Sequence, residues 1–228
     1  IYRDVPLNIV LEDLKYENII TDDLINLFKD LEFFSFLKNM TTVKKEETLE
    51  FETIKDIDPS SLGNELAIEL ILDNENYHTA NIVAMSICDA NKNYHIEKEK
   101  VLNILNKIKD KKIICYDAKK IICNTKIKIN CQDDIMIMAY LLNLNIKDDL
   151  AYLANQNNED YKYYDNMKKE KFANIASEVV KRCRFIFNSK NDYTKKLKDS
   201  NAYNLYEKIE MPLLYVLADM EITGIVCN

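Results

Sequence analysis

Glycine and proline are scarce in this sequence, and tryptophan is absent. The 228 residues include two Gly, three Pro and no Trp. Average usage, about 7% glycine, would give roughly 16 glycines in a chain of this length. Enzymes whose folds depend on glycine-rich phosphate-binding loops are therefore nearly excluded. Arginine is also rare, with Arg3, Arg182 and Arg184 against many lysines, and the abundance of Asn and Ile indicates an AT-rich genome.

Long apolar runs and metal-type cysteine motifs are missing as well. No run reaches the roughly 18 residues of a membrane span, and no secretory leader is present, so we expect a cytoplasmic protein. The six cysteines form no CxxC pair, and only His78 and His95 accompany them, so we expect free, largely buried thiols and no zinc site. His78 and His95 have no neighbouring nucleophile, and we expect structural or surface roles for both.

The composition favours a folded, acidic protein. With 47% hydrophobic and 30% charged residues the chain can bury a core, and its net charge of −7 argues against a free-standing nucleic-acid binder. Its first residue is Ile1, and we expect a fragment of a longer protein. We expect this fragment to be a monomer.

Hydrophobic periodicity predicts a meander of strands followed by alternating strands and helices, a mixed α/β layer fold. The predicted strands are 66–72, 81–88, 93–96, 112–115 and 127–129. The predicted helices are 21–40, 98–109, 118–124, 133–142, 148–154, 169–187 and 201–223. The basic stretch 190–198 is expected to be a solvated loop.

The most specific signal lies near the end of the chain. The segments Ile-Glu-Met-Pro-Leu at 209–213 and Leu-Ala-Asp-Met-Glu at 217–221, followed by Gly224 and Ile225, resemble the junction of the exonuclease and polymerase domains in bacterial DNA polymerase I, a family A polymerase. Residues 1–6 and the helix after them resemble the connector that follows the 5′-nuclease domain in that family. The resemblance implies four parts: a connector at 1–40, a linker at 41–60, a 3′–5′ exonuclease-like domain at 61–190, and a linker with the first polymerase helix at 191–228.

The resemblance implies an RNase-H-like fold and a function in DNA replication and repair. In that family four carboxylates hold two divalent metals that catalyse hydrolysis of the DNA strand. The matching positions here are Glu69, Ile71, Asp117 and Val179, so two of the four acids are replaced by apolar residues. We read these positions as vestigial, and we expect no catalytic residue, metal or other cofactor in this fragment.

Two hypotheses stay open from the sequence. In the first, the chain is a non-catalytic module whose partners are the remainder of the polymerase chain and, through it, DNA, with Mg²⁺ serving only the parent polymerase. In the second, it is an active metal-dependent exonuclease that uses Glu69, Asp117 and a substitute acid, Asp134 or Glu178. We expect Asp133 and Asp134 to cap the next helix and Asp73 to belong to a turn.

Overall fold

A computed structural model describes residues 21–31, 33, 49–144, 146, 149–157 and 160–224. The chain divides into two units, Ile1–Lys44 and Lys45–Asn228.

In the first unit α1 covers Asp22–Asp30, and Thr21 Oγ1 accepts a hydrogen bond from Leu24 N at 3.2 Å, as expected for an N-cap. The predicted helix 21–40 is too long: the helix ends at Asp30, and Phe33 N donates to Phe28 O at 2.8 Å to close its last turn. Residues 34–40 lie outside the described part.

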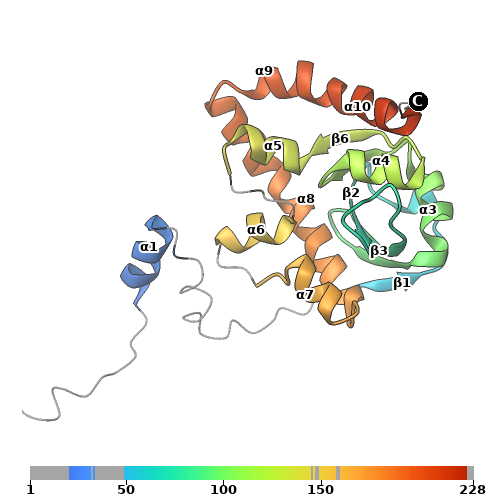
Figure 1. Ribbon diagram of the computed structural model, residues 1–228, viewed down its shortest axis with the longest axis horizontal. Helices are drawn as coiled ribbons and strands as arrows, with labels where there is room; N and C mark the ends of the chain where they lie inside the picture. The colour runs from blue at the N-terminus through green and yellow to red at the C-terminus, as the bar shows by residue number, and fades with distance from the viewer. Residues whose placement is uncertain are drawn as a thin grey trace, which may run out of the picture. The chain divides into compact units, whose positions relative to one another are not determined.

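The second unit contains a six-stranded mixed sheet (Figure 1). Its strands follow the order β1-β4-β3-β2-β5-β6 across the sheet. β2, β3 and β4 form an antiparallel meander, whereas β5 and β6 continue the sheet from β2 in parallel. The strands are β1 (Glu52–Ile54), β2 (Glu65–Leu72), β3 (Ile82–Cys88), β4 (Asn93–Glu97), β5 (Lys112–Cys115) and β6 (Cys131–Asp134).

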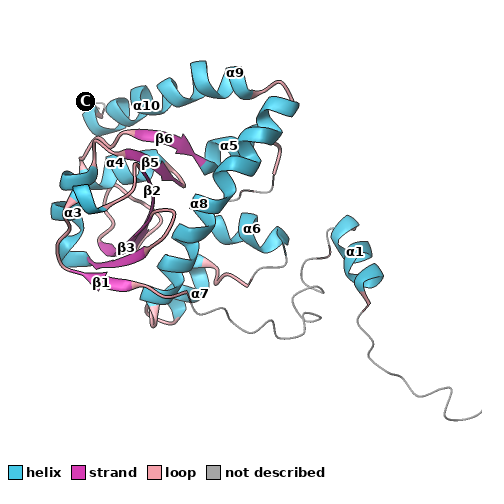
Figure 2. Cartoon of the chain, turned by 180° about the vertical axis from the view of Figure 1, so that it is seen from behind, coloured by secondary structure: helices cyan, strands magenta, loops and turns pink. Residues whose placement is uncertain are grey.

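Helices cover both faces of this sheet, which explains why β2 is almost continuously apolar (Figure 2). The long helix α8 packs on β2 and β3, and α4 packs against α10. The α-helices of this unit are α3 (Val101–Ile108), α4 (Ala118–Thr125), α5 (Ile135–Leu141), α6 (Leu150–Ala154), α7 (Tyr164–Lys169), α8 (Ile175–Asp199), α9 (Tyr203–Leu205) and α10 (Met211–Thr223). Short 3₁₀ turns are η2 (Pro59–Ser61), η3 (Lys98–Lys100) and η4 (Asn155–Asn157). In the part of the chain described here, none of the helices is both long and apolar enough to cross a bilayer.

The strand predicted at 127–129 is wrong, and β6 lies at Cys131–Asp134 instead. The apolar residues Ile127 and Ile129 are buried in the segment before the strand, so they gave the stronger pattern. β6 contains two acids because their carboxylates are satisfied inside the protein: Asp133 accepts from Tyr206, and Asp134 accepts from backbone N–H groups.

The helix predicted at 169–187 is two helices. α7 ends at Lys169, and α8 begins at Ile175 after a turn in which Lys171, Phe172 and Asn174 have positive φ. The loop expected at 190–198 is also wrong, because α8 continues through it to Asp199. Tyr193 and Leu197, four residues apart, bury their side chains on one face of that helix. The predicted boundary at 190/191 therefore falls inside α8, and the predicted linker 41–60 contains β1.

The C-terminal helix has an irregular start. The prediction was one helix at 201–223; the structure has α9, a π-helical turn η5 at Tyr206–Glu210, and then α10, in which Pro212 occupies the first turn. Proline has no N–H and cannot continue the regular hydrogen-bond ladder, which accounts for the π-turn before it. Gly224, with φ of 69°, ends α10 as predicted.

Candidate functional site

Three of the four positions singled out by the sequence meet at one cavity. Glu69 and Ile71 lie on β2, and Asp117 follows β5, which is the parallel neighbour of β2 with Ile68 paired to Cys115. All three line a cavity of about 260 Å³. The fourth, Val179, lies on α8, which packs across β2. Adjacent parallel strands end at the same edge of the sheet, and this explains how residues 48 positions apart come together.

Glu69 is a buried carboxyl group in the middle of β2. Its side chain is fully enclosed, and Oε2 has no hydrogen-bond partner among the residues that the structure describes. Burial raises the pKa of Glu69, and the positive charges of Lys120 and Arg182 oppose that rise. An unpaired carboxyl oxygen at this depth is costly, so Glu69 depends on these nearby cations.

Ile71 and Val179 belong to one apolar cluster. They are buried together with Ala84 of β3 and Met167 of α7, and Tyr164, Phe172 and Ile175 pack against this group. We call this group the apolar plug. It fills the space beside Glu69 with carbon atoms at the two positions where the family resemblance implies carboxylates.

Asp117 retains its acid but uses it to begin a helix. It has a left-handed backbone, φ 61° and ψ 74°, and its Oδ1 accepts from Lys120 N at 3.0 Å, which caps α4. Its conformation is held by Asp134, whose two carboxylate oxygens accept from Asp117 N at 3.2 Å and from Ala118 N at 2.7 Å. The carboxylate of Asp117 therefore has a structural role, capping α4, that involves no metal.

Asp134 is wholly buried and connects β6 to the first turns of α4 and α5 through hydrogen bonds. Besides the two contacts above, its Oδ1 accepts from Met136 N at 2.9 Å and Ile137 N at 3.3 Å, so it caps α5 as predicted. Burial, and then the charge of Asp117, raise the pKa of Asp134 to about 6, while the backbone N–H donors lower it. Asp133, the other predicted cap, lies in β6 and accepts from Tyr206 Oη at 3.2 Å.

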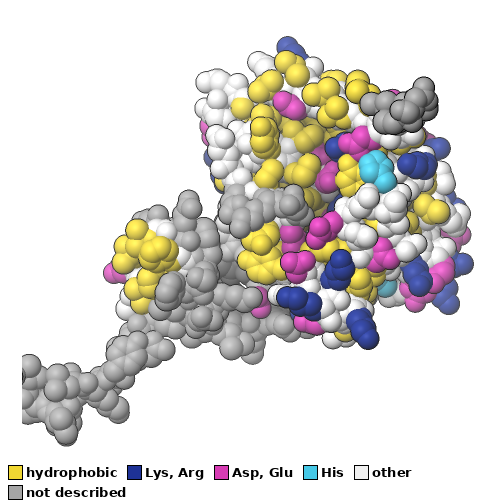
Figure 3. Space-filling model, in the orientation of Figure 1, with side chains coloured by type: hydrophobic (Ala, Val, Ile, Leu, Met, Phe, Trp, Pro, Cys, Tyr) yellow, Lys and Arg dark blue, Asp and Glu magenta, His cyan; other side chains and the backbone are white. Residues whose placement is uncertain are grey.

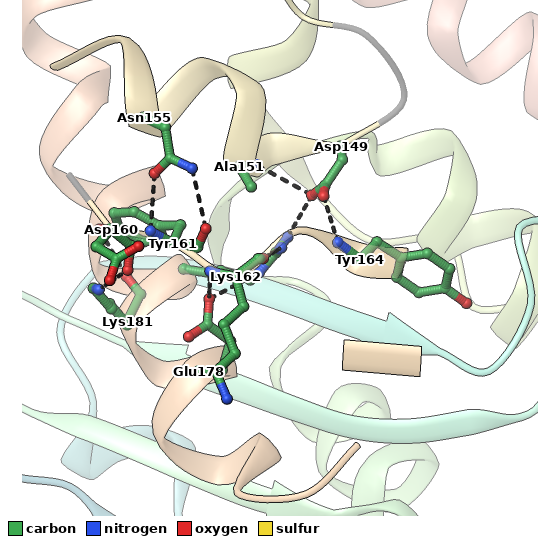
Figure 4. A network of polar contacts seen from close by, with 10 residues as sticks. Asp149, Ala151, Asn155, Asp160, Tyr161, Lys162, Tyr164, Glu178 and Lys181 are labelled. Atoms are coloured by element: carbon green, nitrogen blue, oxygen red, sulfur yellow. Dashed lines mark hydrogen bonds and ion pairs between the residues drawn. The ribbon is translucent and has the colours of Figure 1, made fainter. Parts of the chain in front are cut away.

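A buried arginine also lines the cavity. Arg182 donates from Nη1 to Asp149 Oδ1 at 2.9 Å and from Nη2 to Lys162 O at 2.6 Å, and its Nε lies 3.6 Å from Glu178 Oε1. Figure 4 shows the surrounding network, in which Asp149 also accepts from Ala151 N and Tyr164 N. Burial alone would lower the pKa of Arg182, but the charges of Asp149 and Glu69 raise it overall.

The two substitute acids of the exonuclease hypothesis are not placed to serve it. Neither Asp134 nor Glu178 lines the cavity. Asp134 is committed to four N–H donors, and Glu178 accepts from Lys162 N at 3.0 Å, beside Arg182. Burial raises the pKa of Glu178. Four acids do line the cavity, Glu69, Glu75, Asp117 and Asp149. Asp117 caps α4 and Asp149 is paired with the buried Arg182, whose positive charge opposes further cations there, so these residues do not fit a pair of divalent metals.

One other group of metal-type donors occurs among the described residues. The sulfur atoms of Cys115 and Cys131 and a carboxylate oxygen of Asp134 lie within 4.8 Å of one another. Burial raises the pKa of Cys115 well above its usual value, and Asp134 already accepts four hydrogen bonds. Cys88, Cys115, Cys123, Cys131 and Cys183 are free, as expected, and Cys227 lies outside the described part.

Sequence reasoning missed Arg182, Asp149 and Lys120 as members of this site. A signal was available for Arg182, because it is one of three arginines and follows Val179 by three residues, close to one helical turn. Asp149 fell inside the helix predicted at 148–154 and was given no role of its own. Of the other expected residues, Asp73 does lie in a turn, where it accepts from Asn81 N at 2.8 Å. His78 lies 3.2 Å from Glu221, and His95 is on β4.

Comparisons with known proteins bear on the fold of this chain. The model of the family described as "DNA polymerase I, ribonuclease H-like domain" matches residues 67–183. A DNA polymerase I from Borreliella burgdorferi is 37% identical over 100 residues, which are 40% of this chain and 11% of that protein. The chain therefore spans about a tenth of that relative's length.

Three solved structures share the fold at low sequence identity. The POL domain of Pol1 from M. smegmatis, in complex with DNA primer-template and dNTP, has a TM-score of 0.63 at 15% identity over 78% of this chain and 33% of that one. Brucella melitensis NrnC bound to pGG has a TM-score of 0.61 at 12% identity, covering 78% and 94% of the two chains. The catalytic core of RRP6 from Trypanosoma brucei has a TM-score of 0.59 at 12% identity, covering 79% and 57%. With a family match over half of its length, this chain belongs to the ribonuclease H-like domain family of DNA polymerase I.

Proposed function

We propose that this chain is a non-catalytic, exonuclease-like module of a DNA polymerase I that acts in DNA replication and repair, and that its proofreading site has been lost. The observation that carries the proposal is the apolar plug. Ile71 and Val179 are buried with Ala84 and Met167 at two of the four carboxylate positions. An apolar surface there removes two ligands and disfavours any charge that enters.

The module is also built to hold the C-terminal helix in place. The hydroxyl of Tyr206 in η5 donates to the Asp133 carboxylate and accepts from Asp134 N in β6. Tyr215 of α10 accepts from Cys131 N at 2.8 Å. Glu221 accepts from Lys119 Nζ and Tyr77 Oη, each at 2.7 Å. These polar contacts, spread along η5 and α10, support a scaffold role for the sheet and for α4.

The outer face of the same helix is apolar and exposed. Hydrophobic side chains gather over α9 and α10 at the top of Figure 3. They recur every three or four residues at Leu205, Ile209, Leu213, Val216, Leu217 and Met220. We infer that the remainder of the polymerase chain covers this face, and that the module meets DNA only through the parent enzyme, in the bacterial cytoplasm. We further propose that it needs no cofactor of its own.

A nuclease assay tests the proposal directly. The chain is incubated with 3′-labelled and 5′-labelled single-stranded DNA and Mg²⁺ or Mn²⁺, with a proofreading-competent polymerase as positive control. The matched control is the double variant Glu69→Ala/Asp117→Ala. We expect wild type and double variant to leave the DNA intact. Metal-dependent shortening from the 3′ end that the double variant abolishes would establish the alternative, an active exonuclease using Glu69, Asp117 and a substitute acid.

A further inference from the structure

We propose that the guanidinium group of Arg182 is a built-in cation that has taken over the charge-balancing role of the metals in the lost site. This inference rests on the proposed function, because it applies to a site that no longer binds divalent cations. It assigns to Arg182 a purpose beyond packing: it holds the remaining acids of the cavity in their buried positions.

The position of Arg182 on α8 supports this role. Arg182 follows Val179 by three residues, so both side chains project from nearly the same side of the helix toward β2. Arg182 is 2% exposed and lines the same cavity as Glu69 and Asp117. It is therefore a full positive charge placed next to one of the positions at which a carboxylate has been replaced.

Three acids act on Arg182: Glu69 and Asp149 line the cavity with it, and Glu178 lies outside the cavity. Asp149 forms a direct ion pair with it at 2.9 Å, Glu178 lies 3.6 Å from its Nε, and the charge of Glu69 also acts on it. Lys120, which also lines the cavity, is the other cation whose charge opposes the rise in the pKa of Glu69. Buried carboxylates need such partners, since an isolated buried charge is very costly.

A local ion pair with Asp149 alone would be the simpler explanation of Arg182. The two explanations differ in what happens when the guanidinium is removed. If Arg182 balances several acids, its loss leaves a cluster of unpaired carboxylates that attracts a divalent cation. If it serves only Asp149, its loss destabilises the protein, and a divalent cation brings no recovery.

The experiment compares Arg182→Met with Arg184→Met. Arg184 lies on the same helix but outside the cavity, where it donates to Asn93 Oδ1 and Asp89 O, so it is a matched control. Melting temperatures are measured with and without Mn²⁺, and Mn²⁺ binding is measured by calorimetry. We expect both variants to melt below wild type without metal. Only Arg182→Met should recover with Mn²⁺, with an apparent Kd of about 1 mM or tighter, in the range of weak carboxylate sites. Wild type and Arg184→Met should bind at least about tenfold more weakly.

Recovery of neither variant, or equal recovery of both, would overturn the proposal. If Arg182→Met does not fold even with Mn²⁺, the double variant Arg182→Met/Glu69→Gln is the second test. Asp149, the direct partner of Arg182, stays unpaired in this variant, so a gain of soluble protein over Arg182→Met would show that Arg182 also balances Glu69. No gain over Arg182→Met would overturn the proposal. Either failure, in a protein that does not degrade DNA, leaves the proposed function standing. DNA degradation by the wild type would instead remove the proposed function itself.

Discussion

Replacing Asp134 with asparagine tests whether one buried carboxylate joins β6, α4 and α5. Asp134 accepts three N–H groups at Oδ1 and that of Ala118 at Oδ2. An asparagine keeps one accepting oxygen and turns the other atom into a donor that faces the Ala118 N–H. A buried donor without an acceptor costs about 1–3 kcal/mol, and we expect Asp134→Asn to lose that much free energy of unfolding at pH 7.5.

Urea unfolding followed by circular dichroism measures this loss. Asp58→Asn is the matched control, because Asp58 also caps a helical turn, accepting from Ser60 N at 2.9 Å, but it is exposed. Asparagine is as good an N-cap as aspartate, so the control should change stability by only a few tenths of a kcal/mol. An Asp134→Asn protein as stable as the control variant would refute the reasoning.

The pH dependence gives a second readout of the same substitution. The pKa of Asp134 is raised to about 6 in the folded protein, so the folded state holds a proton that the unfolded state has already released. Binding of this proton stabilises the folded state. The stabilisation is complete below the pKa of Asp134 in the unfolded state and is lost as the pH rises through about 6. Between pH 5.5 and 7.5 wild type should lose about 1 kcal/mol more than Asp134→Asn. Parallel pH profiles for the two proteins would contradict this.

Two further substitutions test how the C-terminal helix is held. Tyr206→Phe removes a buried hydroxyl that donates to Asp133 at 3.2 Å and accepts from Asp134 N at 3.0 Å. In urea titration it should lower the free energy of unfolding by about 1–2 kcal/mol. An unchanged unfolding midpoint would contradict the assigned contacts. Glu221→Gln weakens the contacts with Lys119 and Tyr77. Compared with wild type, it should speed amide hydrogen exchange in α10 while the β2 amides stay protected. Equal exchange rates in wild type and variant would count against the anchoring role of Glu221.

Much of the fold was predictable because its pattern is local. β2, β3 and β5 each contain an apolar run, β4 is more polar, and the structure places all four where the sequence predicted them, to within one residue. β6 was missed because its two acids look like surface residues. Asp134 caps the adjacent α5, as predicted, but Tyr206 and the N–H groups that begin α4 come from other parts of the chain. Local periodicity holds no information about these distant partners.

The sequence named the positions of the candidate site but not the residues that surround them. Glu69, Ile71, Asp117 and Val179 were identified through the family resemblance, and three of them do line one cavity. The role of Arg182 could not be read in this way, because its partner Asp149 lies 33 residues earlier on a different helix. A buried ion pair becomes visible only when the packing of α6 against α8 is known.

Under the proposed function, the apolar plug would make the loss of the proofreading site hard to reverse in evolution. A single change such as Val179→Asp would place an unpaired charge against Ile71 and Met167, and the protein would lose stability before it gained any ligand. Replacing Ile71 alone with an acid would likewise bury an unpaired charge in the same apolar cluster. Under that proposal, restoring the site would need several simultaneous substitutions, including one at Arg182. Substitutions could then accumulate on the surface of this module while its interior keeps the apolar plug.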